Sequence, residues 1–301
     1  MTGMKAVVRA CAALLAFSFA SCAQAPAQEE GAISPLLYVV RDHDSTMYLY
    51  GTVHVRPRGA DWGNARVRAA IDESSEIWTE LMMDPEADHQ IQVMAQRLGT
   101  AEPGRPLSSW LTPEENASLN SVTTRLGFPQ GALEGYKPWL AALTLTVAPL
   151  QRAGYDPASG VDRSVDAYSD NAGKTMRSLE TAEQQLSFFA NLSPEMQREM
   201  LQEAITESEN LPAMLGELST AWEEGDERAL EHAVIDDTRT EYPDLYRMLF
   251  LDRNNAWMTV LTHEMEGSGV DFIAVGAGHI IGSDGLVAQF RARGYRVERV
   301  R

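Results

Sequence analysis

Two histidines stand in the same short motif, one near each end of the chain. His54 follows Gly51 by three residues, and His279 follows Gly276 by three residues. Each glycine ends an apolar run that is typical of a buried strand. Glycine allows a sharp turn or a close approach to a ligand, and neutral imidazole can bind a metal or accept a proton. The repeated Gly-x-x-His motif therefore predicts one site assembled from both ends of the chain.

Two glutamates extend this candidate set. Glu80 lies at the end of a strand-like run, Glu76–Leu81, and Glu180 directly follows another, Thr175–Leu179. If these strands are parallel, their carboxyl ends meet at one edge of the sheet, where open α/β folds bind ligands. Imidazole and carboxylate groups together suit Zn²⁺, Mn²⁺ or Co²⁺, with positions left for water. A metal-bound water would then be the nucleophile and a carboxylate the proton acceptor.

Every member of the set also has a structural interpretation. The histidines can bond backbone carbonyls in their turns. Glu80 can cap the turn that follows it, and Glu180 precedes Thr181, where a helix dipole favours a carboxylate. Arg253 can bind a substrate carboxylate through two hydrogen bonds, but a surface ion pair is the interpretation that so acidic a chain favours. The sequence alone leaves these alternatives open.

Other polar residues are interpreted structurally. Asp162 closely follows a glycine and is expected to begin a helix, while Asn254 and Trp257 are expected to pack or cap. His263 lacks the second histidine of a zincin motif, because residue 267 is glycine. The remaining histidines are expected to be solvated: His43 in a hairpin turn, and His89 and His232 in acidic helices.

Strand-like runs gather at the two ends of the chain. Leu36–Val40 and Thr46–Tyr50 predict a hairpin near the start. Val270–Val275 and Tyr295–Val300 predict two strands joined by a helix over 283–293. This arrangement predicts an α/β protein with a central mixed or mostly parallel sheet built from both chain ends.

The long middle of the chain is predicted to be a large helical insertion. Helical spacing covers 84–173, and after the strand candidate ending at Glu180 it continues to about residue 267. Two helix starts combine a capping residue, proline at the first position and acids in the first turn. They are Thr112-Pro113-Glu114-Glu115 and Ser193-Pro194-Glu195.

Charge and composition limit the classes of function. The 301 residues include 43 acidic and 25 basic ones, which gives a formal net charge of −18. Lys and Arg supply the phosphate contacts on which nucleic-acid binding depends, so a nucleic-acid partner is excluded. A hydrophobic share of 44% is enough for a sizeable core, and residues 28–301 are expected to form a single α/β domain.

The first 27 residues are predicted to be a targeting leader. Lys5 and Arg9 precede an apolar run that is too short for a stable membrane span. Ala25-Pro26-Ala27 fits a signal peptidase, whereas Phe19-Ala20-Ser21-Cys22 fits a lipoprotein box that would place a lipid anchor on Cys22. Either route exports the protein, to the periplasm or, as a lipoprotein, to the outer membrane. Both cysteines lie in this region, so the domain itself has no thiolate ligand for a metal.

Several stretches match, in order, those of a known family. They are Tyr48–His54, Lys137–Leu140, Gly160–Asp162, Ser178–Gln185, Arg253–Trp257 and Val275–Glu298. On these stretches the chain resembles the TraB/GumN family, which is related to the Tiki metalloproteases and to the erythromycin esterase/ChaN-like fold. The resemblance implies that His54 and His279 are paired active-site histidines and that Glu80 is their acidic partner. Tiki proteins cleave peptides with a divalent metal, so a similar metal site is implied here.

The sequence therefore predicts an exported metal-dependent hydrolase, peptidase- or esterase-like, that acts on a peptide or a small molecule. His54, His279 and Glu80 would bind Mn, Co or Zn. Glu80 and Glu180 are the candidate proton-transfer groups, and Arg253 would orient the substrate. The alternative is a non-catalytic periplasmic binding protein that uses the same crevice for haem, a metal or a peptide. A third interpretation, an accessory factor for polysaccharide export, depends on the family name alone.

Overall fold

The computed structural model describes residues 33–301. The predicted leader, residues 1–27, lies outside the described residues, as do both of its processing signals. No helix within 33–301 has the length and apolar character needed to cross a membrane.

A six-stranded sheet in the order β6-β4-β7-β2-β1-β8 forms the centre of the fold. β6, β4, β7 and β2 are parallel, and β1 is antiparallel to its neighbours β2 and β8. The prediction of a mostly parallel mixed sheet built from both chain ends is confirmed. The strands are β1 (Leu37–Arg41), β2 (Ser45–Thr52), β4 (Glu76–Thr79), β6 (Thr175–Ser178), β7 (Gly269–Gly276) and β8 (Arg296–Arg299), and a separate pair joins β3 (Arg56–Pro57) to β5 (Tyr155–Asp156).

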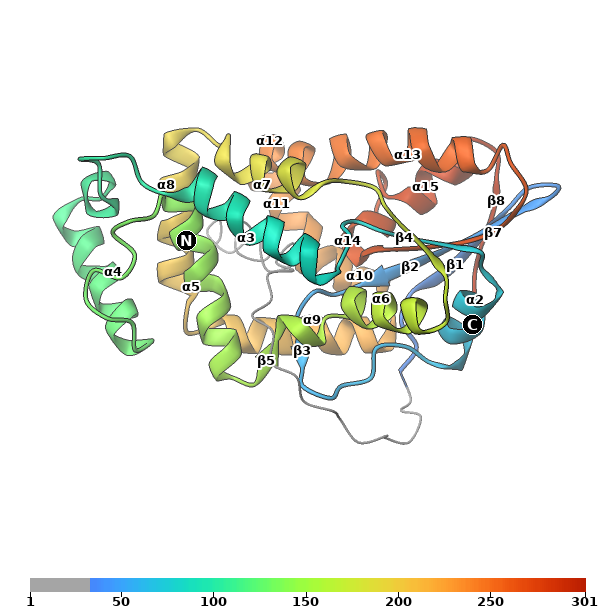
Figure 1. Cartoon of the computed structure of the whole chain (residues 1–301), viewed down its shortest axis with the longest axis horizontal. Coiled ribbons are helices and arrows are strands. Elements are labelled where there is room, and N and C mark those ends of the chain that lie inside the picture. Colours follow the sequence, from blue (N-terminus) through green and yellow to red (C-terminus); the bar gives the residue numbers. More distant parts are fainter. Residues whose placement is uncertain (1–32) are drawn as a thin grey trace.

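Helices cover both faces of the sheet and extend beyond one of its edges. In Figure 1, α13 and α15 lie above the strands, α2 and α6 lie below them, and α3, α4, α5 and α8 extend to the left. The α-helices are α2 (Ala65–Glu73), α3 (Pro85–Gly99), α4 (Pro113–Arg125), α5 (Pro138–Arg152), α6 (Val161–Asn171), α7 (Ala182–Ala190), α8 (Pro194–Glu207), α9 (Leu211–Glu224), α10 (Glu227–Glu231), α11 (Asp237–Glu241), α12 (Pro243–Tyr246), α13 (Asp252–Glu264), α14 (Ala277–Ile280) and α15 (Leu286–Ala292). Short 3₁₀ turns occur at η2 (Leu107–Trp110) and η3 (Pro157–Ser159), and π-helical turns at η4 (His232–Asp236) and η5 (Arg247–Leu251).

The central strands are apolar because both of their faces are covered. Leu49 and Tyr50 in β2 point to opposite faces, yet both have no exposed surface. Phe272 and Ile273 in the neighbouring β7 behave in the same way. A strand that is buried on both faces has an almost continuous apolar sequence, and this pattern made β2 and β7 recognisable.

Local capping fixes the predicted helix starts. Thr112 and Glu115 form a capping box at the start of α4, and Ser193 caps α8 through the backbone N–H of Met196. The final helix is shorter than predicted. It begins at Leu286 because Gly282, with a φ of 79°, turns the chain first.

The helix α9 is tied directly to the carboxyl end of β2. The indole Nε1 of Trp222 donates a hydrogen bond of 2.7 Å to the carbonyl of Gly51. Its ring is fully buried, lies edge-on to Tyr50 and contacts the guanidinium of Arg56. Trp222 therefore joins the helical part to the strand that carries the first Gly-x-x-His motif.

We expect Trp222→Phe to lower the free energy of unfolding by about 1–3 kcal/mol, because it leaves a buried carbonyl without a donor. Urea denaturation followed by circular dichroism measures the change. Trp110→Phe is the matched control, since Trp110 is only half-buried and stacks on Arg105; its cost should stay below about 1 kcal/mol. Equal losses in the two variants would show that the bond to Gly51 contributes nothing specific.

Candidate active site

The four side chains that the sequence places at the ends of strands lie close together at one edge of the sheet. His54 follows β2, Glu80 follows β4, Glu180 follows β6, and His279 lies in α14 directly after β7. These four strands are parallel, so their carboxyl ends share this edge. All four side chains are buried, with exposed fractions between 2% and 8%.

Glycine at two motif positions permits close packing. A β-carbon on Gly276 would lie 3.2 Å from Glu80 Oε1 and 3.5 Å from His54 Nε2. A β-carbon on Gly51 would lie 3.2 Å from Ala277, so the two Gly-x-x-His turns pack against each other. Neither glycine has a positive φ. The motif therefore needs glycine for space and not for an unusual backbone conformation.

Arg253, on α13, forms hydrogen bonds with three of the other site residues, Glu80, Glu180 and His279. Its side chain has five N–H donors, and each has a partner inside the protein. Nε and Nη2 donate to Glu180 at 2.8 Å each, Nη2 also donates to Glu80 at 2.6 Å, and Nη1 reaches the Leu249 carbonyl at 3.1 Å and His279 Nε2 at 2.9 Å. Arg253 thus joins the ends of β4 and β6 to the second histidine motif.

The expected surface ion pair of Arg253 is wrong, because its side chain is only 2% exposed and its partners are buried glutamates. Nor does Arg253 offer a donor to a substrate in this arrangement, since all five are in use. The π-helical turn η5 directly precedes it and supplies the Leu249 carbonyl. Such turns often occur at functional sites, where they re-aim the residues that follow.

Glu180 has no acceptor position left. Besides the two bonds from Arg253, its oxygens accept 3.0 Å from Trp257 Nε1 and 2.9 Å from Gln185 Nε2. The helix after it is capped by Thr181, so the carboxylate of Glu180 is directed to Arg253 and not to the helix end. Trp257, expected to pack or cap, is therefore also a hydrogen-bond donor within the site.

His279 has both ring nitrogens in use. Arginine can only donate, so Nε2 accepts from Arg253, and the proton must lie on Nδ1, which donates 2.7 Å to Asn254 Oδ1. Burial, and then the positive charge of Arg253, hold the pKa of His279 well below its usual value. His279 is therefore neutral, with one fixed tautomer.

His54 is paired with Asp162, a residue that sequence analysis interpreted as a helix start. His54 Nδ1 lies 3.3 Å from Asp162 Oδ2, and both side chains are 4% exposed. Gly160 allows this approach: a β-carbon there would lie 2.6 Å from both the Asp162 carboxylate and the His54 carbonyl. The match over Gly160–Asp162 was the one sequence signal that pointed to this contact.

The two sides of the site carry opposite pKa shifts. Burial opposes the charged form of His54, but the carboxylate of Asp162, followed by that of Glu80, outweighs it and raises the pKa of His54. Burial would likewise raise the pKa of Glu80, but the positive charge of Arg253 and the Gly276 N–H lower this pKa to about 2. Glu80 is therefore ionised at neutral pH, whereas His54 titrates above 6.5.

Two neighbouring atoms keep the capacity to bind a further group. Within residues 33–301, Glu80 Oε1 accepts one hydrogen bond, of 2.7 Å from the Gly276 N–H, while Glu80 Oε2 accepts from Arg253 and from Gln185. His54 Nε2 lies 4.0 Å from Glu80 Oε1, which is too far for a direct hydrogen bond, and it accepts no hydrogen bond from another described residue. A water about 2.8 Å from both atoms would complete a triangle of ordinary hydrogen bonds.

The predicted metal ligands do not form one coordination sphere in this arrangement. His54 Nε2 and Glu80 Oε1 are near each other, but the third predicted ligand, His279, has given its Nε2 to Arg253. The positive charge that a divalent metal would bring already comes from the buried guanidinium. In this arrangement, His54, Glu80 and His279 therefore cannot bind one metal ion together.

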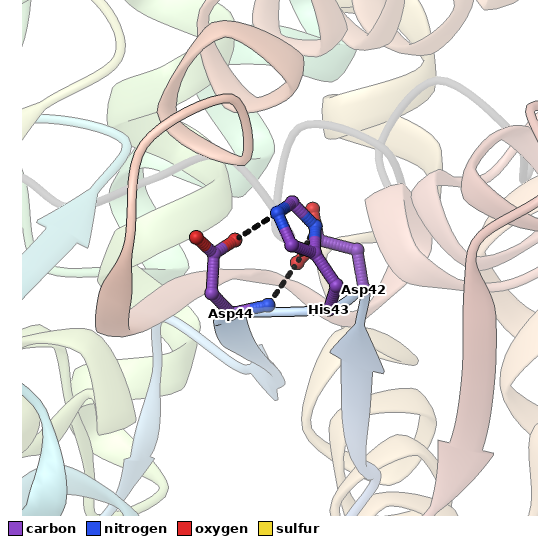
Figure 2. Close-up of side chains that lie close together, drawn as sticks. All are labelled: Asp42, His43 and Asp44. Carbon is purple, nitrogen blue, oxygen red and sulfur yellow. Dashed lines mark hydrogen bonds and ion pairs between the residues drawn. The ribbon is translucent and has the colours of Figure 1, made fainter.

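Within 33–301, the one group with three ligand atoms inside 4.8 Å of one another lies elsewhere, in the β1–β2 turn. Figure 2 shows its members, Asp42, His43 and Asp44, all of which are exposed. Asp42 Oδ1 accepts the backbone N–H groups of Asp44 and Ser45, which is typical of a hairpin turn. His43 is therefore a solvated turn residue, as predicted.

Fold and site together define an α/β protein with a buried histidine, carboxylate and arginine centre at the carboxyl edge of a mostly parallel sheet. A scan against family models matches residues 36–299 to the TraB/PrgY/gumN family. The chain belongs to the TraB/PrgY/gumN family. Searches of curated proteins and of solved structures found no match.

Removing the guanidinium should create the metal site that it now prevents. Arg253→Met frees His279 Nε2 and Glu80 Oε2, so we expect it to bind Zn²⁺ more tightly than the wild type in metal analysis by mass spectrometry. It should also cost about 3–5 kcal/mol of folding free energy, because two buried carboxylates lose their partner.

Arg177→Met is the control for this variant. Arg177 is half-exposed, forms an ion pair with Glu76 and lies over the Trp78 ring, so its removal should cost much less folding free energy than that of Arg253 and leave zinc binding unchanged. A wild-type protein that holds stoichiometric metal, and loses it in both His54→Ala and His279→Ala, would contradict the arrangement described here.

Proposed function

We propose that this protein is a hydrolase of amide or ester bonds in which His54 removes a proton from a water molecule held beside Glu80. The observation that carries the proposal is the proximity of two atoms with free bonding capacity, His54 Nε2 and Glu80 Oε1, which lie 4.0 Å apart. A reactive group needs free bonding capacity, and these two atoms have it.

Asp162 prepares His54 for this role. A carboxylate at Nδ1 favours the tautomer that leaves Nε2 free to accept a proton, and it stabilises the imidazolium that forms. Glu80, ionised by Arg253, lies on the opposite side and also favours the imidazolium. Two carboxylates thus flank the base and stabilise the proton that Nε2 takes from water. After the resulting hydroxide attacks the carbonyl carbon, the imidazolium returns this proton to the leaving alkoxide or amine as the ester or amide bond breaks.

Glu180 and Arg253 act as positioning residues in this proposal. Arg253 fixes Glu80 and His279, and Glu180 fixes Arg253. No step is assigned to a metal, because the third predicted ligand is committed to Arg253.

The proposed substrate is a peptide or a small ester or amide outside the cytoplasm. Support for this location comes only from the leader-like residues 1–27 and their two processing signals. The competing proposal, a binding protein that uses the same site without turnover, is separated from hydrolysis by the variants below.

We expect His54→Gln and Glu80→Gln to lower kcat/KM by about 10²–10⁴-fold on p-nitrophenyl acetate or on a peptide library, because each removes one side of the water site. Mass spectrometry of products and steady-state absorbance measure the loss. His43→Gln is the matched control, since His43 is 85% exposed and distant from the site in the fold, and it should retain full activity. Wild-type turnover no faster than that of either variant would remove the hydrolase proposal and favour a binding protein.

The pH profile tests the role of Asp162. His54 must be neutral to accept a proton, and its pKa is raised, so kcat/KM should increase with pH through a value above 6.5. In Asp162→Asn the carboxylate that raises this pKa is gone while burial remains, so the acid limb should move to lower pH and the maximum should fall.

The same shift has a consequence for stability. Because the folded-state pKa of His54 is raised, its protonation stabilises the fold below about pH 6.5, and this contribution is lost as pH rises through the raised pKa. Asp162→Asn should remove that dependence, whereas Glu195→Gln, which removes one exposed carboxylate on α8, should preserve both the pH limb and the stability profile. An unshifted limb in Asp162→Asn would show that Asp162 does not set the proton affinity of the base.

A further inference from the structure

A small cavity adjoins the two histidine motifs, and neither Arg253 nor Glu80 lines it. Its volume is about 20 Å³. The floor comes from residues 52–55 and 276–279, which include both histidines, and the walls come from Leu215, Leu218, Ser219, Val234 and Phe250. This free volume is sufficient for a group of about one or two heavy atoms.

The cavity lining is mostly apolar: its polar side chains are the two histidines and the hydroxyl groups of Thr52 and Ser219, and it contains no carboxylate, lysine or arginine. Burial of a charged or strongly polar group there would remove its hydration without supplying an ion-pair partner, which is costly. An apolar group would lose no hydrogen bonds and would gain contacts with Leu215, Val234 and Phe250, all at most 5% exposed. The chemistry of the walls therefore selects a small apolar occupant.

The walls are held in place by the motif itself. A β-carbon on Gly278 would lie 2.8 Å from Phe250 Cε1 and 2.9 Å from Val234 Cγ1, so both side chains press on the backbone just before His279. Val234 belongs to the π-helical turn η4 and Phe250 to η5. Two independent π turns thus close the cavity against the second histidine motif, which limits its size.

We propose that this cavity is a specificity subsite that accepts the methyl or ethyl group attached to the carbonyl of the bond that is cleaved. The proposal rests on the proposed function and deepens it, because it selects acetyl, propionyl or alanyl-type substrates over larger acyl groups. Leu215, Val234 and Phe250 determine the size limit, and none of them takes part in proton transfer.

A series of p-nitrophenyl esters, from acetate through propionate and butyrate to hexanoate, tests the size limit. In the wild type, kcat/KM should fall by at least about 10²-fold from propionate to hexanoate. Leu215→Ala opens one wall and should raise the hexanoate-to-acetate ratio about tenfold or more. Leu211→Ala is the matched control, since Leu211 lies one turn earlier on α9, is equally buried and does not line the cavity. An unchanged ratio in Leu215→Ala, or the same change in both variants, would overturn the proposal.

A binding measurement separates the subsite from the hydrolase. Propionamide should perturb the methyl NMR signals of Leu215 and Val234 in the wild type, whereas hexanamide should perturb the Val234 signals only in Leu215→Ala. Val234→Leu, which fills the cavity, should abolish the propionamide response at the Leu215 methyl groups even if it leaves the fold intact. These responses without ester turnover would support the proposed subsite and contradict the proposed hydrolase. Ester turnover without a propionamide response at these methyl groups would support the hydrolase and contradict the subsite.

Discussion

The buried ion pairs of Arg253 with Glu80 and Glu180 are the interaction on which the rest of the site depends. Two carboxylates at the ends of neighbouring strands would repel each other in a site from which water is excluded. The guanidinium compensates both charges and, through its remaining donors, fixes the neutral tautomer of His279. A helix more than seventy residues beyond Glu180 in the sequence is thereby locked to the carboxyl edge of the sheet.

The hydrogen bonds of Arg253 make the two histidines of the site different from each other. The two Gly-x-x-His motifs look equivalent in sequence, but one histidine has both nitrogens bonded, and the other keeps Nε2 free beside Glu80. Their partners explain the difference. Arg253 lowers the pKa of His279, whereas Asp162 raises the pKa of His54. Similar local motifs therefore take a structural role in one case and, in the function proposed here, a chemical role in the other.

The polar centre and the apolar cavity share the same backbone. Gly276 gives Glu80 and His54 room on one side, and Gly278, two residues later, is pressed by the side chains of two π turns. A single turn of chain between β7 and α14 thus separates charged groups from an apolar pocket.

The sequence by itself determined the strands, the helix caps and the four residues at strand ends, because these features depend on local periodicity and capping chemistry. The hairpin, the capping box at Thr112 and the positions of His54, Glu80, Glu180 and His279 at strand ends follow from such patterns. That the four side chains share one edge depends on the parallel pairing of their strands, which the tertiary structure decided. Only the tertiary structure decided that Arg253 points inward and that Asp162 faces His54. The partner of a charged side chain depends on which distant elements exclude water around it, and no local pattern records that.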